Sequence, residues 1–238
     1  MNHLYRQRTL SLCTLILIAC TCVLHAQQPD ALHKKLQQMQ QTMSRNEQQL
    51  HTYQWIETAT ITIDGRPKPP RQSLCRYTPV GTLSKTPLGP PPQMSEARGG
   101  PFRKMMVRKK MEEFQEELSQ VRALTGMYLP PNRVKLRQAF EVNKVTFERN
   151  GAGGNAIVIH DYAKPGDELR LVLSPSTMQI QRIAVKTYLD QPKDILTADV
   201  EFASLADGTS YPSITTIRVP SKKLSLTTVS SNFSKAIY

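Results

Sequence analysis

The sequence has 238 residues, of which 31 are lysine or arginine and 19 are aspartate or glutamate, giving a formal net charge of +12. It contains no RNA-binding aromatic motif and no DNA-reading helix signature, so we expect no nucleic acid partner. Three of its four cysteines lie within the first 22 residues, which leaves Cys75 alone in the rest of the chain. The composition therefore predicts a basic protein without an internal disulfide.

The first 26 residues have the pattern of a cleaved secretory signal. Arg6 and Arg8 precede the apolar stretch Leu10 to Leu24, which at 15 residues is too short to span a bilayer, and Ala26 offers a small residue for cleavage. We expect a mature chain that starts near Gln27 and is periplasmic or secreted. Alternatively, Leu17 to Cys20 resembles a bacterial lipobox, in which case a lipidated Cys20 would anchor the protein to a membrane.

Two predicted elements follow the signal. We expect residues 30–50 to form a helix, because apolar residues recur there at spacings of three, four and seven residues. These residues are Leu32, Leu36, Met39, Met43 and Leu50, with glutamines between them. Tyr53 to Ile63 then alternates apolar and polar residues, as a half-buried strand does, and ends in the turn signal Asp64-Gly65. Residues 71–78 are expected to return beside it.

Residues 79–101 contain six prolines and four glycines, and we expect a loop or insert there that cannot lie inside a sheet. The following residues 102–126 have the spacing of an amphipathic helix, with the apolar stripe Val107, Met111, Phe114, Leu118 and Val121. Its first turns are basic and rich in methionine. Such a helix would lie on an anionic membrane, cover an apolar ligand, or pack on a sheet as ordinary core.

The remaining residues predict an antiparallel sheet. After a short helical piece at 134–140, strands rich in β-branched residues alternate with turn signals and no helix intervenes. We expect residues 27–238 to form a single α+β domain, mainly antiparallel β. Its curved half-barrel sheet would carry the N-terminal helix and the internal amphipathic helix.

Known catalytic motifs are absent from the sequence. His160 and Asp161 are neighbours in a predicted strand, so their side chains would point to opposite faces. We therefore expect no catalytic residue, no metal and no cofactor, and would look first at Glu57 and His160 for an unfamiliar hydrolytic site.

The order of elements, from an amphipathic helix through "LHTYQWIETATITIDG" to successive hairpins, resembles the lipoprotein-carrier superfamily of LolA-like and RseB-like proteins. The phrases "CRYTPVGTLSKTPLG", "TYLDQPKD" and "FASLADGTSYP" look closer to secreted bacterial proteins without a known activity. The resemblance implies a half barrel whose apolar hollow is plugged by helices. The aromatic content of this chain, 6%, is low for such a hollow.

These observations predict a non-enzymatic envelope protein that binds a lipid, an acyl chain or a lipidated polypeptide. Seven residues would line or cover the hollow: Tyr53, Trp55, Ile61, Met105, Met106, Met111 and Phe114. Five would contact anionic head groups or a membrane surface: Arg103, Lys104, Arg108, Lys109 and Lys110. The alternative is a structural or interaction module with a filled core, whose basic surface docks on another envelope protein.

Overall fold

The computed structural model describes residues 28–90, 101–149 and 155–236. The chain divides into two compact units, residues 1–41 and 42–238. The predicted signal segment and Cys20 lie outside the described residues, and the single mature domain stays a prediction. No helix in the described ranges is long and apolar enough to cross a bilayer.

The three predicted helices are confirmed. They are α2 (Gln28–Leu50), α3 (Pro101–Gly126) and α4 (Arg133–Glu141), and a 3-10 turn, η1 (Pro220–Lys222), lies between two strands. The side chain of Asn132 caps α4, because its oxygen accepts the backbone N–H groups of Val134 and Lys135 at 2.9 and 3.1 Å.

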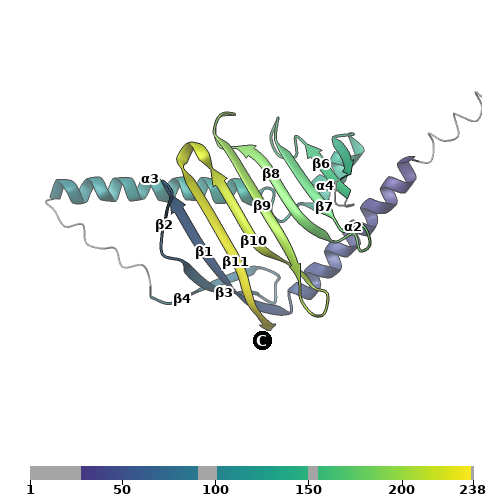
Figure 1. Ribbon diagram of the computed structural model, residues 1–238, viewed down its shortest axis with the longest axis horizontal. Helices are drawn as coiled ribbons and strands as arrows, with labels where there is room; N and C mark the ends of the chain where they lie inside the picture. Colours follow the sequence, from purple (N-terminus) through teal and green to yellow (C-terminus); the bar gives the residue numbers. More distant parts are fainter. Residues whose placement is uncertain (1–27, 91–100, 150–154, 237–238) are drawn as a thin grey trace, which may run out of the picture. The chain divides into compact units, whose positions relative to one another are not determined.

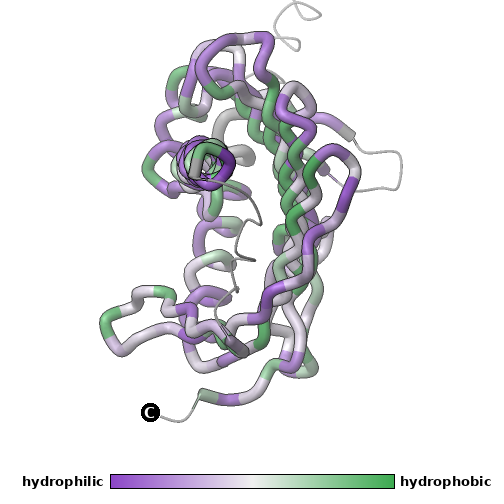
Figure 2. Tube along the Cα trace, turned by 90° about the vertical axis from the view of Figure 1, so that its left-hand side faces the viewer, coloured by the Kyte–Doolittle hydropathy of each residue, from purple (hydrophilic) through white to green (hydrophobic). Residues whose placement is uncertain are grey.

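Eleven strands form one sheet in the order β4-β3-β1-β11-β10-β9-β8-β7-β6-β5, and the short β2 pairs with β1 (Figure 1). The strands are β1 (Tyr53–Ile63), β2 (Arg66–Pro67), β3 (Arg71–Tyr77), β4 (Leu83–Leu88), β5 (Val145–Arg149), β6 (Asn155–His160), β7 (Glu168–Leu173), β8 (Ile180–Tyr188), β9 (Ile195–Ser204), β10 (Ser210–Val219) and β11 (Leu224–Lys235). Every pair is antiparallel, and among the described strands β4 and β5 do not pair with each other. The sheet is thus open and curved, which confirms the predicted α+β half barrel (Figure 2).

The strand β4 corrects one expectation. Residues 79–101 were expected to stay outside the sheet because of their prolines, yet Leu83–Leu88 pairs with β3 along its whole length. Pro87 lies in this strand, which is an edge strand, so the missing N–H need not remove a bond to a further neighbour.

The register separates the two faces of the sheet. Directly paired residues point to the same side, so Ile61, Leu226, Ile217, Ala198 and Val185 lie in one row across β1, β11, β10, β9 and β8. We call this side the inner face. Since Thr187 lies on it and bonds Tyr128, just beyond α3, this helix packs on the inner face. Figure 2 shows α3 end-on, beside one face of the sheet.

Strands β6 to β9 carry a tightly packed core on this face. Leu169 and Leu171 of β7 are fully buried, and Ile183, Val185 and Val200 of the next two strands are at most 3% exposed. They pack beneath the second half of α3 and beneath α4. The buried residues of these two helices include Leu118, Val121 and Leu124 of α3 and Leu136 and Ala139 of α4.

A buried carboxylate fixes the chain beyond α3 to the β6–β7 connection. Asp167 is 2% exposed, and its carboxylate accepts the hydroxyl of Tyr128 at 2.5 Å. It also accepts the backbone N–H groups of Tyr162, Ala163 and Lys164 at 2.6 to 2.9 Å. Oδ1 accepts one of these bonds and Oδ2 accepts three, so hydrogen bonds compensate the burial of this carboxylate.

Candidate functional site

The inner face is not buried equally along the sheet. Some inward side chains of β1, β10 and β11 are half-buried, whereas Leu171, Ile183, Val185 and Val200 on the same face of β7 to β9 are almost inaccessible. We call this half-buried area the inner strip, and it consists of Ala59, Ile61, Ile63, Thr215, Leu226 and Thr228. It contains no charged side chain, so it is an uncharged, mostly apolar surface on the curved side of the sheet.

The second half of α3 closes one end of the inner strip. Val219 and Leu224, which pair with each other beside Ile63, are buried. Lys222 of η1 donates to the carboxylate of Glu117 at 2.9 Å, which ties α3 to the connection between β10 and β11. The helix therefore crosses the sheet where β1 ends.

An aromatic cluster closes the other end. Its members come from distant parts of the chain: His51, Tyr53, Trp55, Tyr77, Tyr211 and Phe233. Phe233 is at its centre, stacked on Trp55 at 5.6 Å between ring centroids and tilted against Tyr211 at 4.2 Å. Tyr53 and Trp55 are buried, so these two rings form packing rather than accessible surface.

Polar contacts hold this cluster in place. The hydroxyl of Tyr53 donates to Asp207 at 2.5 Å, and the ammonium of Lys235 lies 3.7 Å from the Tyr53 ring centroid. The Tyr53 hydroxyl, the groups of Thr209 and the charge of Lys235 hold the pKa of Asp207 well below its ordinary value.

An ion pair borders the inner strip on the side of β3 and β4. Lys85 of β4 reaches across β3 and donates to both carboxylate oxygens of Glu57, at 2.7 and 2.8 Å. Glu57 precedes Ala59 on the same face of β1, and its side chain is 18% exposed. Arg71, which pairs with Ala59, is exposed at this border. The border thus combines one half-buried acid with two accessible cations.

Cys75 lies beneath the same border and is fully buried. Burial raises the pKa of its thiol, and the nearby negative charge of Glu57 raises it further. The thiol is therefore held in its protonated, unreactive form, which suits a packing role.

The residues predicted for the hollow occupy different environments. Ile61 lies in the inner strip, Phe114 is half-buried on α3, and Tyr53 and Trp55 belong to the buried aromatic cluster. The three methionines lie in the first half of α3 and are 44 to 50% exposed: Met105, Met106 and Met111. The five predicted cations of α3 are exposed as well. The structure brings Ile61 near the end of the strip where α3 crosses, but it does not gather all seven residues around one hollow.

Sequence reasoning missed several residues of this site. Leu226, Thr228 and Phe233 come from β11, and Arg71 and Lys85 from β3 and β4. The alternation in β11 was a usable signal, but its pairing with β1 was not visible in the sequence.

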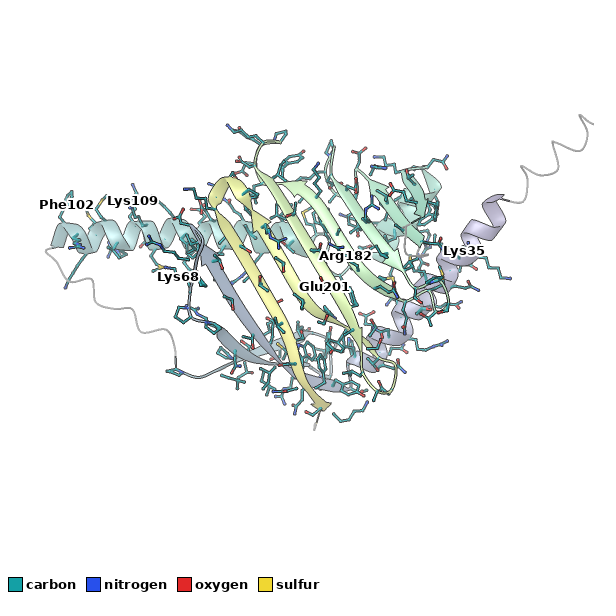
Figure 3. The ribbon with its side chains drawn as sticks, in the orientation of Figure 1. Lys35, Lys68, Phe102, Lys109, Arg182 and Glu201 are labelled. Carbon is teal, nitrogen blue, oxygen red and sulfur yellow. The ribbon has the colours of Figure 1, made fainter. Side chains whose placement is uncertain are left out.

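The opposite, outer face has a different chemistry. It carries a depression of about 230 Å³ whose outward side chains are Glu168, Ala184, Lys186, Thr197, Asp199 and Arg218. Beside it, Arg182 pairs with Asp199 and lies next to Glu201 on the neighbouring strand (Figure 3). Its charged walls make this depression unsuited to an apolar ligand.

The residues considered for hydrolysis do not converge. Glu57 lies on β1 and His160 on β6, with five strands between them, so they are roughly 25 to 30 Å apart. His160 contacts the hydroxyl of Thr146 at 3.3 Å instead. Within the described residues there is no group of three or more His, Cys, Asp or Glu side chains that would hold a metal ion.

Comparison with known proteins gives only distant likenesses. No protein-family model matches the sequence, and no curated protein matches it. Among solved structures, a DUF1329 family protein from Desulfovibrio piger has 6% identity and a TM-score of 0.41, covering 86% of this chain and 93% of its own. A LolA superfamily protein from Nitrosomonas europaea has 6% identity and a TM-score of 0.37, covering 84% and 94%.

A protein of the superfamily that the sequence resembles is therefore among the similar structures, as a likeness of general architecture.

Proposed function

We propose that the protein is a non-enzymatic, exported envelope protein that binds the acyl chain of a lipid or lipidated polypeptide on the inner strip. The observation that carries the proposal is the burial contrast on one face. Leu171 is fully buried, whereas Ile61 and Leu226 stay half-exposed between α3 and the aromatic cluster. A surface that is uncharged, concave and bounded at both ends suits an extended apolar group.

The expected affinity follows from the burial of methylene groups. Each one removed from water contributes roughly 0.8 kcal/mol, so an acyl chain needs only part of its length on the strip to bind. The polar end of the ligand would lie at the border formed by Glu57, Lys85 and Arg71. There Arg71 is exposed and would meet a carboxylate or phosphate, while Lys85 is shared with Glu57.

Native mass spectrometry after incubation with phospholipids and fatty acids tests the proposal. We expect a ligand in defined stoichiometry, and we expect its loss in the variant Ile61→Thr, which adds a hydroxyl to the strip. The matched control is Ile214→Thr on the outer face of β10, where the isoleucine is 38% exposed. If both variants retain the ligand equally, the ligand binds outside the inner strip.

The solid packing beneath β6 to β9 favours the second candidate, an interaction module with a filled core. A ligand-free mass that no lipid changes would support that module.

A further inference from the structure

The first half of α3 extends beyond the sheet, and nothing in the described residues covers it. Leu118 and Val121 of its apolar stripe are buried, but Val107 and Met111 of the same stripe are 45% and 44% exposed. Figure 1 shows this part of the helix projecting past β1 and β2. We call residues 102–113 the overhang. Phe102 and Lys109 are labelled on it in Figure 3.

The overhang exposes apolar side chains in two directions. Phe102, Met105 and Met106 are spaced by three and four residues, so they share one side of the helix and are 73%, 50% and 46% exposed. Val107 and Met111 belong to the other side, which continues the stripe.

The positive charge of the overhang indicates which kind of partner it fits. The ten residues from Phe102 to Met111 contain five cations and no acid. Within the described residues, Arg108 alone among the five forms an ion pair, at 3.6 Å to Glu112, and both side chains are highly exposed. Long basic side chains keep their charges at an interface while their stems lie on apolar surface. An anionic surface with an apolar layer beneath it would accept both the cations and the exposed apolar side chains.

We propose that the overhang docks on an anionic lipid membrane, immersing Phe102, Met105 and Met106 while its cations meet lipid head groups. This docking is independent of acyl binding on the inner strip. Methionine suits an interface because its flexible side chain adapts to irregular apolar surroundings, and phenylalanine is typical of the apolar face of interfacial helices.

Methionine oxidation in the presence of vesicles locates the contact on the full chain. The protein is exposed to hydrogen peroxide alone, with phosphatidylcholine vesicles, or with vesicles containing about one third phosphatidylglycerol. We expect the anionic vesicles to protect Met105 and Met106 from sulfoxide formation. Met127, which is 41% exposed just beyond the other end of α3, serves as the internal control and should oxidise equally in all three samples.

Vesicle sedimentation with charge variants measures the electrostatic part. Removing two cations in R103Q/K109Q should weaken partition to anionic vesicles by about thirtyfold, since each cation near such a surface contributes about 1 kcal/mol. The matched control R66Q/K68Q removes the same two residue types from the exposed segment at β2 and should change partition by less than about twofold.

Unprotected Met105 and Met106 in vesicle-bound protein, or equal partition of both double variants, would overturn the proposal. So would an absence of vesicle binding, which would direct the search toward an acidic protein partner.

Discussion

The two ends of the sheet differ in how the same inner face is used. Toward β6 to β9 it is a core in which leucine, isoleucine and valine are excluded from water by α3 and α4. Toward β1, β10 and β11 the same face keeps apolar side chains half-accessible and borders them with an ion pair. A continuous sheet thus provides both a packed end and an apolar surface that stays partly exposed.

The largest expected difference between the ends is in the free energy of unfolding. Leu171→Ala should cost about 2 to 5 kcal/mol because it leaves a cavity in a closed core. Leu226→Ala, the same substitution in the inner strip, should cost about 1 kcal/mol because its side chain is already partly exposed to water. Denaturant unfolding of the two variants measures both values, and equal costs would mean that the strip is core.

The packed end should control stability at alkaline pH. Burial, with the hydrogen bond to Asp167, raises the pKa of Tyr128 above its ordinary value of 10.0. The folded state therefore favours the neutral phenol, a stabilisation that is complete below pH 10 and is lost as the pH rises further. Tyr128→Phe should flatten the fall in unfolding free energy above pH 10. An unchanged slope would assign that fall to Tyr77 and Tyr162, whose pKa values burial also raises.

The open end should control a smaller effect at acidic pH. Because the pKa of Asp207 is lowered in the fold, its stabilisation is present above the ordinary value of 3.8 and is lost as the pH falls below it. The effect is small since the carboxylate is exposed to solvent, which weakens its interactions. Asp207→Asn should reduce the loss of thermal stability below about pH 4. The same loss in variant and wild type would exclude Asp207 as its source.

Local patterns predicted the elements well, and the contacts between them less well. Two patterns depend only on neighbours in sequence: the apolar–polar alternation in β1 and the spacing of apolar residues by three and four in α2 and α3. The helices and the first hairpin were therefore predicted close to their observed bounds. Strand β4 was missed because its proline argued against a sheet, and an edge position, which makes proline tolerable, is a property of the whole fold.

The site itself depended on contacts that the sequence did not reveal. Tyr53 and Trp55 were predicted as ligand contacts, but Phe233 packs against both and helps to bury them. Asp167 did not stand out in the sequence, since nothing local indicates that Tyr128 donates to it. The exposed methionines of α3 show the same limit, because helical spacing does not tell where the sheet beneath a helix ends.

The position of β11 has a consequence for how the molecule is assembled. This strand follows the other ten in the chain, yet it lies between β1 and β10. Glu57 therefore pairs with Ser230, and the hairpin that contains Trp55 is joined to the rest of the sheet only through residues made much later. Contacts of such long range slow folding, because a large loop must close before they form. Until β11 is in place, β1 has a free edge on that side, so the half of the molecule proposed to bind ligand is also the half completed last.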